Sequence, residues 1–557
     1  MLLSEWISGF SRFITSGEWL NALLAIAIVA VHVRAYGTAA CRLIKLDFAD
    51  RLAELSVSST LGFVAFAAQI WLMGAVGFWH APPFIASSLI AAAFLLYQRL
   101  GGRSAKNVEK PGATELDAPA ARSNLNNNVT SPQKTATLER EKTATEVVEQ
   151  SSPTAMAPPA RWQFNFDSVL VACVGLTLLL VLVSAIKPPY LTDEVEYHWA
   201  AAVAWADAGH WIAVPFRYMS GPCLAEMLYL VGAVFHSSTA AHLTHALFFV
   251  TLIAGCASLA RTAGGSALAA AAGICATQVF TNQAALGLND VAFTALSIGG
   301  LVALLRSTGS DLRPAIVAAS IALVGAVSIK PFAFVVALTY GVSVLVVARK
   351  ASQPKAIKFA AVVMLLAVVG TTALWKLHTK YLTGSFASPP LIMIPADQSL
   401  AQHQEAVGKW PSLGSVVSLP VVPFITPVLG QQEPYGSRTG LIGIPFALLL
   451  CLCWKKMTPQ HRFWSALLLG CFLIYFFCVG AFSVRTRYLS YAWALLVCLS
   501  AIGVTAARQQ WRHPARVAVS TFFCLAVIVG IADSSHVLLH WPGKTMARVI
   551  PQFTVPE

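Results

Sequence analysis

Carboxylates that could take part in acid–base chemistry occur at a few points of an otherwise apolar chain. The first group lies in PPYLTDEVEYHW (188–199), directly after the apolar run 169–186, and contains Asp193, Glu194 and Glu196. Charged residues make up only 11% of the 557 residues, so three acids within four positions at a membrane exit need a reason. A carboxylate there can accept a proton from an alcohol, or it can cap the helix that follows.

Helix capping explains part of this group. Asp193 is a good N-cap residue and Glu196 stands three positions later, as in a capping box that opens a helix running through Trp205. This helix is expected to lie along the membrane surface, with His198 at the interface rather than acting as a ligand. Capping and catalysis both remain open for Asp193.

A second acid and a lysine lie in later turns. Asp290 stands in ALGLNDVAF (285–293) at the start of an apolar run, where it could react or, with Asn289, cap the helix. Lys330 interrupts the apolar stretch 314–348 in SIKPF (328–332), at an expected tight turn. A lysine in that position must extend its amine to the membrane surface or meet an anion.

Two arginines supply further positive charge. Arg485 and Arg487 stand in VRTRYL (484–489), at another expected turn between apolar runs. Acids and cations at one end of a helical bundle suit a site that deprotonates an alcohol and stabilises a departing phosphate.

Composition determines which elements must position these residues. With 57% hydrophobic residues and a mean hydropathy of +0.66, the sequence predicts an all-α, polytopic membrane protein. Apolar runs predict about fourteen transmembrane helices, at 19–35, 57–79, 82–99, 167–186, 239–260, 265–283, 286–305, 313–330, 332–349, 357–376, 439–454, 463–483, 487–507 and 516–536.

The distribution of basic residues predicts the orientation. Lysines and arginines recur in alternate short connections, which places those connections in the cytoplasm. The candidate acids and cations then face the opposite side. The formal net charge of +13 is explained by the basic residues of these cytoplasmic connections, and it does not indicate nucleic acid binding.

Three parts are expected along the chain. Residues 1–100 form a three-span membrane unit, and residues 101–161 are polar enough to predict a disordered cytoplasmic linker. Residues 162–557 form a core of about eleven spans with outer loops at 187–238 and 377–438.

The order of the motifs resembles the GT-C superfamily of membrane glycosyltransferases. The motifs are PPYLTDEVEYHW, MSGPCLAEMLYLVG (219–232), GLNDVAFTAL (287–296), SIKPF, YLTGSFASPP (381–390) and RTRYL (485–489). The similarity is closer to the bacterial branch related to protein O-mannosyltransferases and the aminoarabinose transferase of lipid A. It covers about 167–510. The segment GSFASPP departs from the Asn-Pro pair of relatives, and the three N-terminal spans have no counterpart in the usual core.

This resemblance implies a multi-pass enzyme of the bacterial inner membrane whose active site faces the periplasm. It implies a polyprenyl-phosphate-linked sugar as donor and a glycan, lipid or protein as acceptor. The catalytic acids fall on Asp193, with Glu194 beside it, and on Asp290. The residues that bind the donor phosphate correspond to Lys330 and Arg487, and Arg485 is a further candidate cation for the phosphate.

The residues also favour a lipid-linked donor independently, because the chain has no P-loop and no dinucleotide fingerprint. In the expected reaction Asp193 accepts the acceptor proton, the acceptor oxygen attacks the anomeric carbon with inversion, and Lys330 and Arg487 hold the leaving phosphate. Asp290 and Glu194 would orient the acceptor or a divalent ion. No cofactor is certain, and oxygen ligands leave magnesium or manganese as an option.

A long polar segment, 381–438, is expected to form a lid over this site. Tyr435 and Arg438 within it, together with Glu196 and His198, are the candidates for acceptor or lid contacts. Two other functions stay open: a transporter or flippase of a lipid-linked saccharide, and a non-catalytic membrane assembly subunit whose acids only cap helices.

Overall fold

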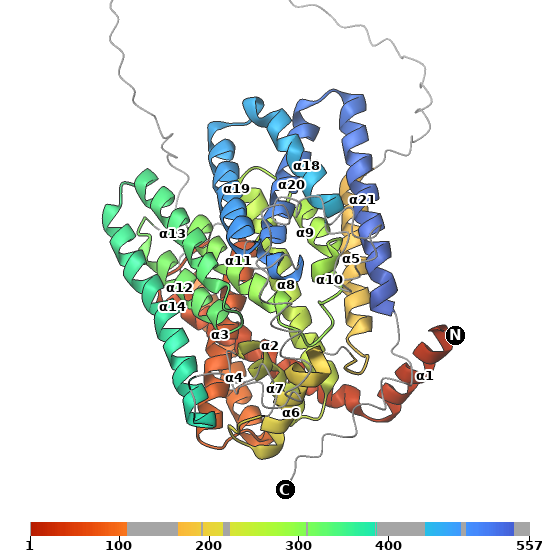
Figure 1. Ribbon diagram of the computed structural model, residues 1–557, viewed down its shortest axis with the longest axis vertical. Coiled ribbons are helices and arrows are strands. Elements are labelled where there is room, and N and C mark those ends of the chain that lie inside the picture. Colours follow the sequence, from red (N-terminus) through yellow and green to blue (C-terminus); the bar gives the residue numbers. More distant parts are fainter. Residues whose placement is uncertain are drawn as a thin grey trace, which may run out of the picture. The chain divides into compact units, whose positions relative to one another are not determined.

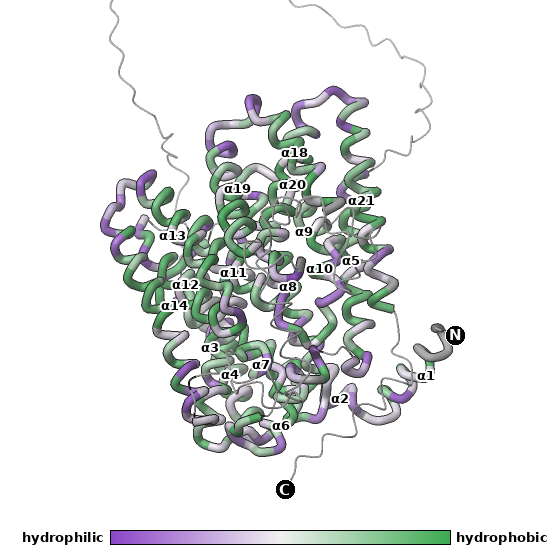
Figure 2. Tube along the Cα trace, viewed as in Figure 1, coloured by the Kyte–Doolittle hydropathy of each residue, from purple (hydrophilic) through white to green (hydrophobic). Residues whose placement is uncertain are grey.

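The computed structural model describes residues 2–48, 50–108, 165–190, 193–214, 223–307, 310–384, 386, 440–480 and 486–539. Within these ranges every regular element is a helix. Most of the long helices are hydrophobic along their length, and hydrophilic positions gather at helix ends and in the interior around α8 (Figure 2). The predicted all-α membrane fold is confirmed.

Ten helices among the described residues are long and apolar enough to cross a membrane. They are α2 (Glu18–Leu43), α3 (Arg51–Ala75), α4 (Ala81–Val108), α5 (Phe166–Ser184), α8 (Ser238–Thr262), α13 (Ala333–Lys350), α14 (Pro354–Thr383), α19 (Pro459–Gly480), α20 (Ser490–Gln510) with the short helix η3 (Thr486–Leu489) before it, and α21 (His513–Leu539).

The remaining helices are shorter. They are α1 (Leu2–Thr15), η1 (Glu194–His198), α6 (Trp199–Ala208), α7 (Leu224–Val234), α9 (Ala267–Cys275), α10 (Gln278–Thr281), α11 (Asp290–Arg306), α12 (Arg313–Val327), α18 (Gly440–Cys453) and η2 (Trp454–Lys456). The predicted number of about fourteen spans is not confirmed, because the runs 265–283, 286–305, 313–330 and 439–454 fall in this shorter class.

The run 265–283 shows why an apolar segment need not form one long helix. It divides into α9 and α10, and Thr277 Oγ1 donates to the Gly273 carbonyl at 2.7 Å while Thr281 Oγ1 donates to the Cys275 carbonyl at 2.6 Å. These hydroxyls satisfy carbonyl groups at the interruption. After α10, a buried, non-helical connection at 282–289 leads directly to Asp290.

The centre of the helical body is formed by α8, α11 and α20, whose residues are buried almost along their whole length. In Figure 1, α8 and α11 lie between the N-terminal helices α2 to α4 and the C-terminal helices α18 to α21. Buried side chains from all these regions join in one hydrophobic core.

The N-terminal helices are part of this body. The described residues up to Leu96 and from Phe166 onwards belong to one compact unit. In this unit, α3 packs against α2, α7, α8, α11 and α12. Residues 101–108 continue α4, and the rest of the predicted linker lies outside the described residues. The division into an N-terminal unit, a linker and a core stays a prediction.

Two glycines set the close approach of α2 and α3. A Cβ atom at Gly62 would overlap the Val33 carbonyl group, and one at Gly37 would overlap that of Ser58. Only a residue without a side chain permits the two backbones to lie this close, as is common where membrane helices associate.

We therefore expect Gly62→Ala to destabilise the protein by roughly 1–3 kcal/mol, the usual cost of overpacking. The matched control is Gly341→Ala in α13, where an added Cβ meets no atom within 4 Å. Unfolding of the full chain in detergent micelles measures both changes. Equal stability of the two variants would show that α2 and α3 can separate without cost.

Candidate functional site

Within the motif at 188–199, residues 194–198 fold as a π-helical turn rather than as a capped α-helix. The turn η1 runs from Glu194 to His198 and continues into α6. Asp193 precedes it with a helical backbone conformation, and its side chain caps no backbone N–H. The capping interpretation of Asp193 is therefore wrong. π-Helical turns are rare and are frequent at functional sites.

Asp193 instead pairs with a predicted cation far along the chain. Its Oδ2 accepts a hydrogen bond from Arg487 Nη1 at 2.6 Å. Burial raises the pKa of Asp193, but the hydrogen bond and charge of Arg487 outweigh it, so the pKa lies below its ordinary value. The Asp193 side chain keeps 25% of its surface exposed, so an ionised carboxylate remains accessible.

Asp290 and Lys330 form the second pair. Asp290 is the first residue of α11, where no side chain caps the helix. Its Oδ1 accepts a hydrogen bond from Lys330 Nζ. Lys330 lies in the turn between α12 and α13, as predicted, and the anion that it needs is Asp290. The capping interpretation of Asp290 is also wrong.

The ring of Tyr488 lies beside one cation of each pair. Lys330 Nζ is 5.2 Å from the ring centroid, and Arg487 Cζ is 5.4 Å from it. Both cations can therefore make cation–π interactions with the same aromatic ring. The structure thus brings the four predicted residues Asp193, Asp290, Lys330 and Arg487 into one place, although they come from four separate turns.

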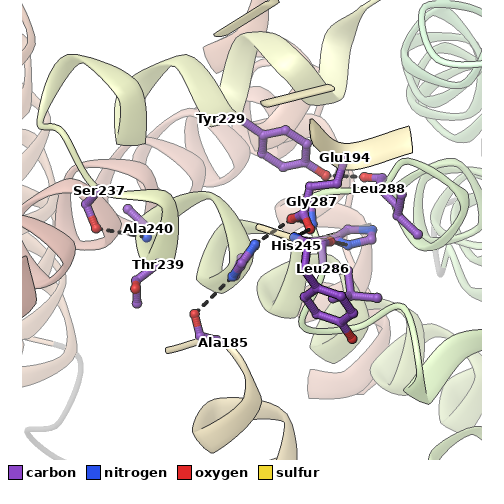
Figure 3. Close-up of polar contacts among 12 residues, drawn as sticks. Ala185, Glu194, Tyr229, Ser237, Thr239, Ala240, His245, Leu286, Gly287 and Leu288 are labelled. Carbon is purple, nitrogen blue, oxygen red and sulfur yellow. Dashed lines mark hydrogen bonds and ion pairs between the residues drawn. The ribbon is translucent and has the colours of Figure 1, made fainter. Parts of the chain in front are cut away.

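Glu194 has a different environment from its neighbour Asp193. Its side chain is fully buried and accepts hydrogen bonds from His242 of α8, from the Gly287 N–H at 2.7 Å and from the Tyr190 N–H at 3.2 Å. Figure 3 shows its carboxylate beside Gly287. Burial raises the pKa of Glu194, but the charge and hydrogen bond of His242 and the two backbone donors outweigh this effect. The pKa of Glu194 therefore lies below its ordinary value. Glu194 therefore ties the η1 turn to α8 and to the connection before Asp290.

His198 forms the other acid–histidine pair. It is buried rather than interfacial, and its Nδ1 contacts Glu226 Oε1 of α7. The other carboxylate oxygen, Glu226 Oε2, is buried and has no hydrogen-bond partner. The expected interfacial position of His198 is thus wrong, because α7 covers it.

Sequence reasoning missed the partners Glu226, His242 and Tyr488. Glu226 was visible as an acid within the motif 219–232, but no spacing connects it to His198. His242 begins an ordinary apolar helix, and its position opposite Glu194 depends on packing alone.

Several predicted residues are not located. Arg485, Tyr435 and Arg438, with most of the expected lid, lie outside the described residues. Glu196 lies within η1, but its side chain is outside the described part. Their roles stay predictions.

A divalent ion also stays a prediction. Among the described residues no group of three or more His, Cys, Asp or Glu side chains comes together as a metal site. Asp193 and Asp290 each have a cation as partner, and a metal ion would have to displace it.

Comparisons with known proteins find a likeness in fold. No family model matches the chain, and no curated protein matches it. Among solved structures, the crystal structure of ArnT from Cupriavidus metallidurans bound to undecaprenyl phosphate has 15% sequence identity and a TM-score of 0.44. The match covers 67% of this chain and 77% of that chain. The likeness in fold is partial.

A buried lysine beside the site offers a pH test. Lys187 follows α5, is 1% exposed, and its Nζ donates to the Val537 carbonyl at 3.2 Å. Burial lowers the pKa of Lys187 to about 7 from 10.5, against the opposing charge of Glu194. Between pH 7 and 10.5 the Lys187 amine therefore binds fewer protons in the folded protein than in the unfolded chain. Because the unfolded chain binds more protons, the contribution of Lys187 to the free energy of unfolding increases with pH over this range.

We expect the melting temperature of the wild type, relative to Lys187→Met, to rise between pH 7 and about 10. Thermal unfolding in detergent measures the difference at each pH. The exposed Lys358→Met is the matched control and should give a constant difference. A constant difference for Lys187→Met as well would show that its ammonium group is not desolvated.

Proposed function

We propose that this protein is a membrane glycosyltransferase that moves a sugar from a polyprenyl-phosphate donor to a hydroxyl group of a periplasmic or lipid-linked acceptor. The observation that carries the proposal is the pairing of an accessible, ionised Asp193 with Arg487, near a second pair, Lys330 with Asp290, whose lysine lies beside the same Tyr488 ring as Arg487. A base and two phosphate-binding cations are what such a transfer requires.

Asp193 is the proposed general base. Its lowered pKa keeps it ionised at neutral pH, and its exposed fraction leaves an oxygen within reach of an acceptor. As the acceptor hydroxyl attacks, its proton passes to Asp193 and its oxygen bonds to the anomeric carbon. The bond between that carbon and the phosphate oxygen breaks on the opposite face, which inverts the configuration.

Lys330 and Arg487 are the proposed phosphate ligands. Each cation is largely buried against a carboxylate. The leaving polyprenyl phosphate would either share the cation with that carboxylate or replace the carboxylate as its counter-ion. Stabilising the charge that develops on the leaving group lowers the barrier, because the cations are held in position before the reaction.

Glu194 and Asp290 have supporting roles in this proposal. Glu194 is fully buried and its carboxylate accepts from three donors, so it positions the Asp193 turn instead of contacting substrate. Asp290 holds Lys330 in the direction of the site. A sugar donor dissolved in the bilayer also fits a site that lies among long apolar helices.

Asp193→Asn should lower the transfer rate by roughly a hundredfold or more while the protein stays folded, since the amide keeps the shape and loses the basicity. The control Asp207→Asn removes an exposed acid of α6 and should have no effect. The assay is transfer from a panel of polyprenyl-phosphate sugars by purified protein in detergent. Wild-type rates for Asp193→Asn would remove Asp193 as the base.

Lys330→Ala and Arg487→Ala should raise the donor KM by roughly ten- to a hundredfold, the value of a charge-assisted contact. The acceptor KM should change much less, because neither cation is the base. Lys358→Ala and Arg516→Ala are exposed controls. An unchanged donor KM in both site variants would contradict the phosphate assignment.

Transfer in detergent also separates this proposal from transport, because a transporter needs a sealed compartment. Glycolipid and glycoprotein mass spectrometry of a strain lacking the protein would name both sugar and acceptor. Loss of no glycoconjugate, together with no transfer in detergent, would argue against an enzyme.

A further inference from the structure

The π-helical turn η1 brings His198 to the same side as Asp193. The Trp199 N–H donates to the Glu194 carbonyl, so the backbone closes over five residues where an α-helix closes over four. In an α-helix, residue i+5 would lie about 140° around the axis from residue i. A turn that closes over five residues carries residue i+5 round to the side of residue i instead. His198 is the fifth residue after Asp193.

The contacts within the turn agree with this arrangement. The Tyr197 hydroxyl donates a hydrogen bond to the Asp193 carboxylate, and the positive charge of His198 acts on the same carboxylate. The rings of Tyr197 and His198 lie beside each other, with centroids 4.2 Å apart. Burial and the charge of Asp193 raise the pKa of Tyr197, so its hydroxyl remains a donor. Asp193 therefore meets a hydroxyl and an imidazole of its own turn in addition to Arg487.

Glu226 of α7 is the partner of this imidazole. Its Oε1 contacts His198 Nδ1, and both side chains are almost wholly buried. Its other oxygen, Oε2, has no hydrogen-bond partner, so His198 is the group that compensates this carboxylate. An ionised carboxylate in an apolar interior requires an opposite charge. His198 supplies that charge when it is an imidazolium.

Other titratable groups surround the pair and Asp193. They are Tyr197 of η1, Cys223 before α7 and Tyr229 within it, His245 of α8, Asp290 with Lys330, and Arg487. Below pH 7 the thiol and the phenols are neutral. His245 directs its Nδ1 to the Leu286 carbonyl, and Lys330 is paired with Asp290. Among the described residues, Arg487 and His198 are the positive charges that act most strongly on Asp193.

We propose that Glu226 and His198 are a positioning pair for the base: Glu226 holds His198 as an imidazolium on the Asp193 side of the π-helical turn, and this charge keeps Asp193 a carboxylate. The inference rests on the proposed function, in which Asp193 accepts the acceptor proton. It explains the rare turn, because an α-helical turn would rotate His198 away from the base. It also gives Asp193 a positive neighbour while Arg487 binds the donor phosphate.

Removing either charge of the pair tests the inference. His198→Gln removes the imidazole, and Glu226→Gln removes the anion, without which a buried imidazole favours its neutral form. A nearby positive charge lowers the pKa of a carboxyl group, so both changes should raise the pKa of Asp193 by roughly one pH unit. The acid limb of kcat/KM should move to higher pH by the same amount, because activity is lost as the base becomes protonated.

Two matched variants separate charge from packing. Glu226→Asp keeps the anion and should leave the titration of Asp193 near that of the wild type. His32→Gln removes another fully buried histidine, which lies in α2 and contacts the Ile28 carbonyl and Ser87. It should leave the titration of Asp193 unchanged.

Two measurements on the purified full chain in detergent report the shift. Transfer from a polyprenyl-phosphate sugar gives the dependence of kcat/KM on pH. Infrared difference spectroscopy follows Asp193 itself, through the carboxylic acid band that Asp193→Asn removes. The infrared titration needs no substrate, so it tests the pair independently of transfer.

The two readouts distinguish failure of this inference from failure of the proposed function. An unshifted titration of Asp193 in both His198→Gln and Glu226→Gln overturns the pair, even where wild-type transfer and its loss in Asp193→Asn support the base. A shifted infrared titration without any transfer by the wild type supports the pair and contradicts the proposed function. Rates lowered equally at every pH, with the acid limb unmoved, make the pair structural and overturn the inference. Melting temperatures report folding, and if one variant unfolds, the other gives the result.

Discussion

The structure depends on one electrostatic constraint: a charge buried among apolar helices must meet an opposite charge. A lone ionised carboxylate in a low-dielectric interior costs several kcal/mol. Four acids near the site satisfy this constraint, Asp193 with Arg487, Asp290 with Lys330, Glu194 with His242, and Glu226 with His198. Each pair joins different helices or turns, so the pairs also determine how those segments meet.

The four pairs differ in access, and their proposed roles follow this difference. Glu194 with His242 and Glu226 with His198 are almost wholly buried. Asp193 with Arg487 keeps part of its surface open. The buried pairs hold the π-helical turn η1 in place from behind, with α8 and α7 as supports. A reactive carboxylate benefits from such rigid support, because its position then needs no rearrangement during the reaction.

Helix interruptions serve the same site. The buried connection between α10 and α11 carries the Gly287 N–H that binds Glu194, and it ends at Asp290. The turn between α12 and α13 presents Lys330. Non-helical backbone inside a membrane protein is tolerated where side chains or neighbouring helices satisfy its polar groups, and it commonly lines a functional cavity.

The amino-acid sequence alone determined the class of protein and indicated the candidate site residues. Long apolar runs can bury their backbone polar groups only as helices, and charges in such runs are costly enough to mark a site. These arguments identified Asp193, Asp290, Lys330 and Arg487 before any contact was known. They also placed Lys330 correctly in a turn.

Only the tertiary structure decided which acid meets which cation. A capping box at Asp193 and Glu196 and an ion pair with Arg487 are equally compatible with the local sequence, and packing of distant helices selected the pair. The same holds for Glu226 and His242, and for the interrupted run 265–283, whose threonine hydroxyls satisfy the freed carbonyls. Local propensity acts over one or two helical turns, whereas these contacts join residues brought together only by the folded helical body.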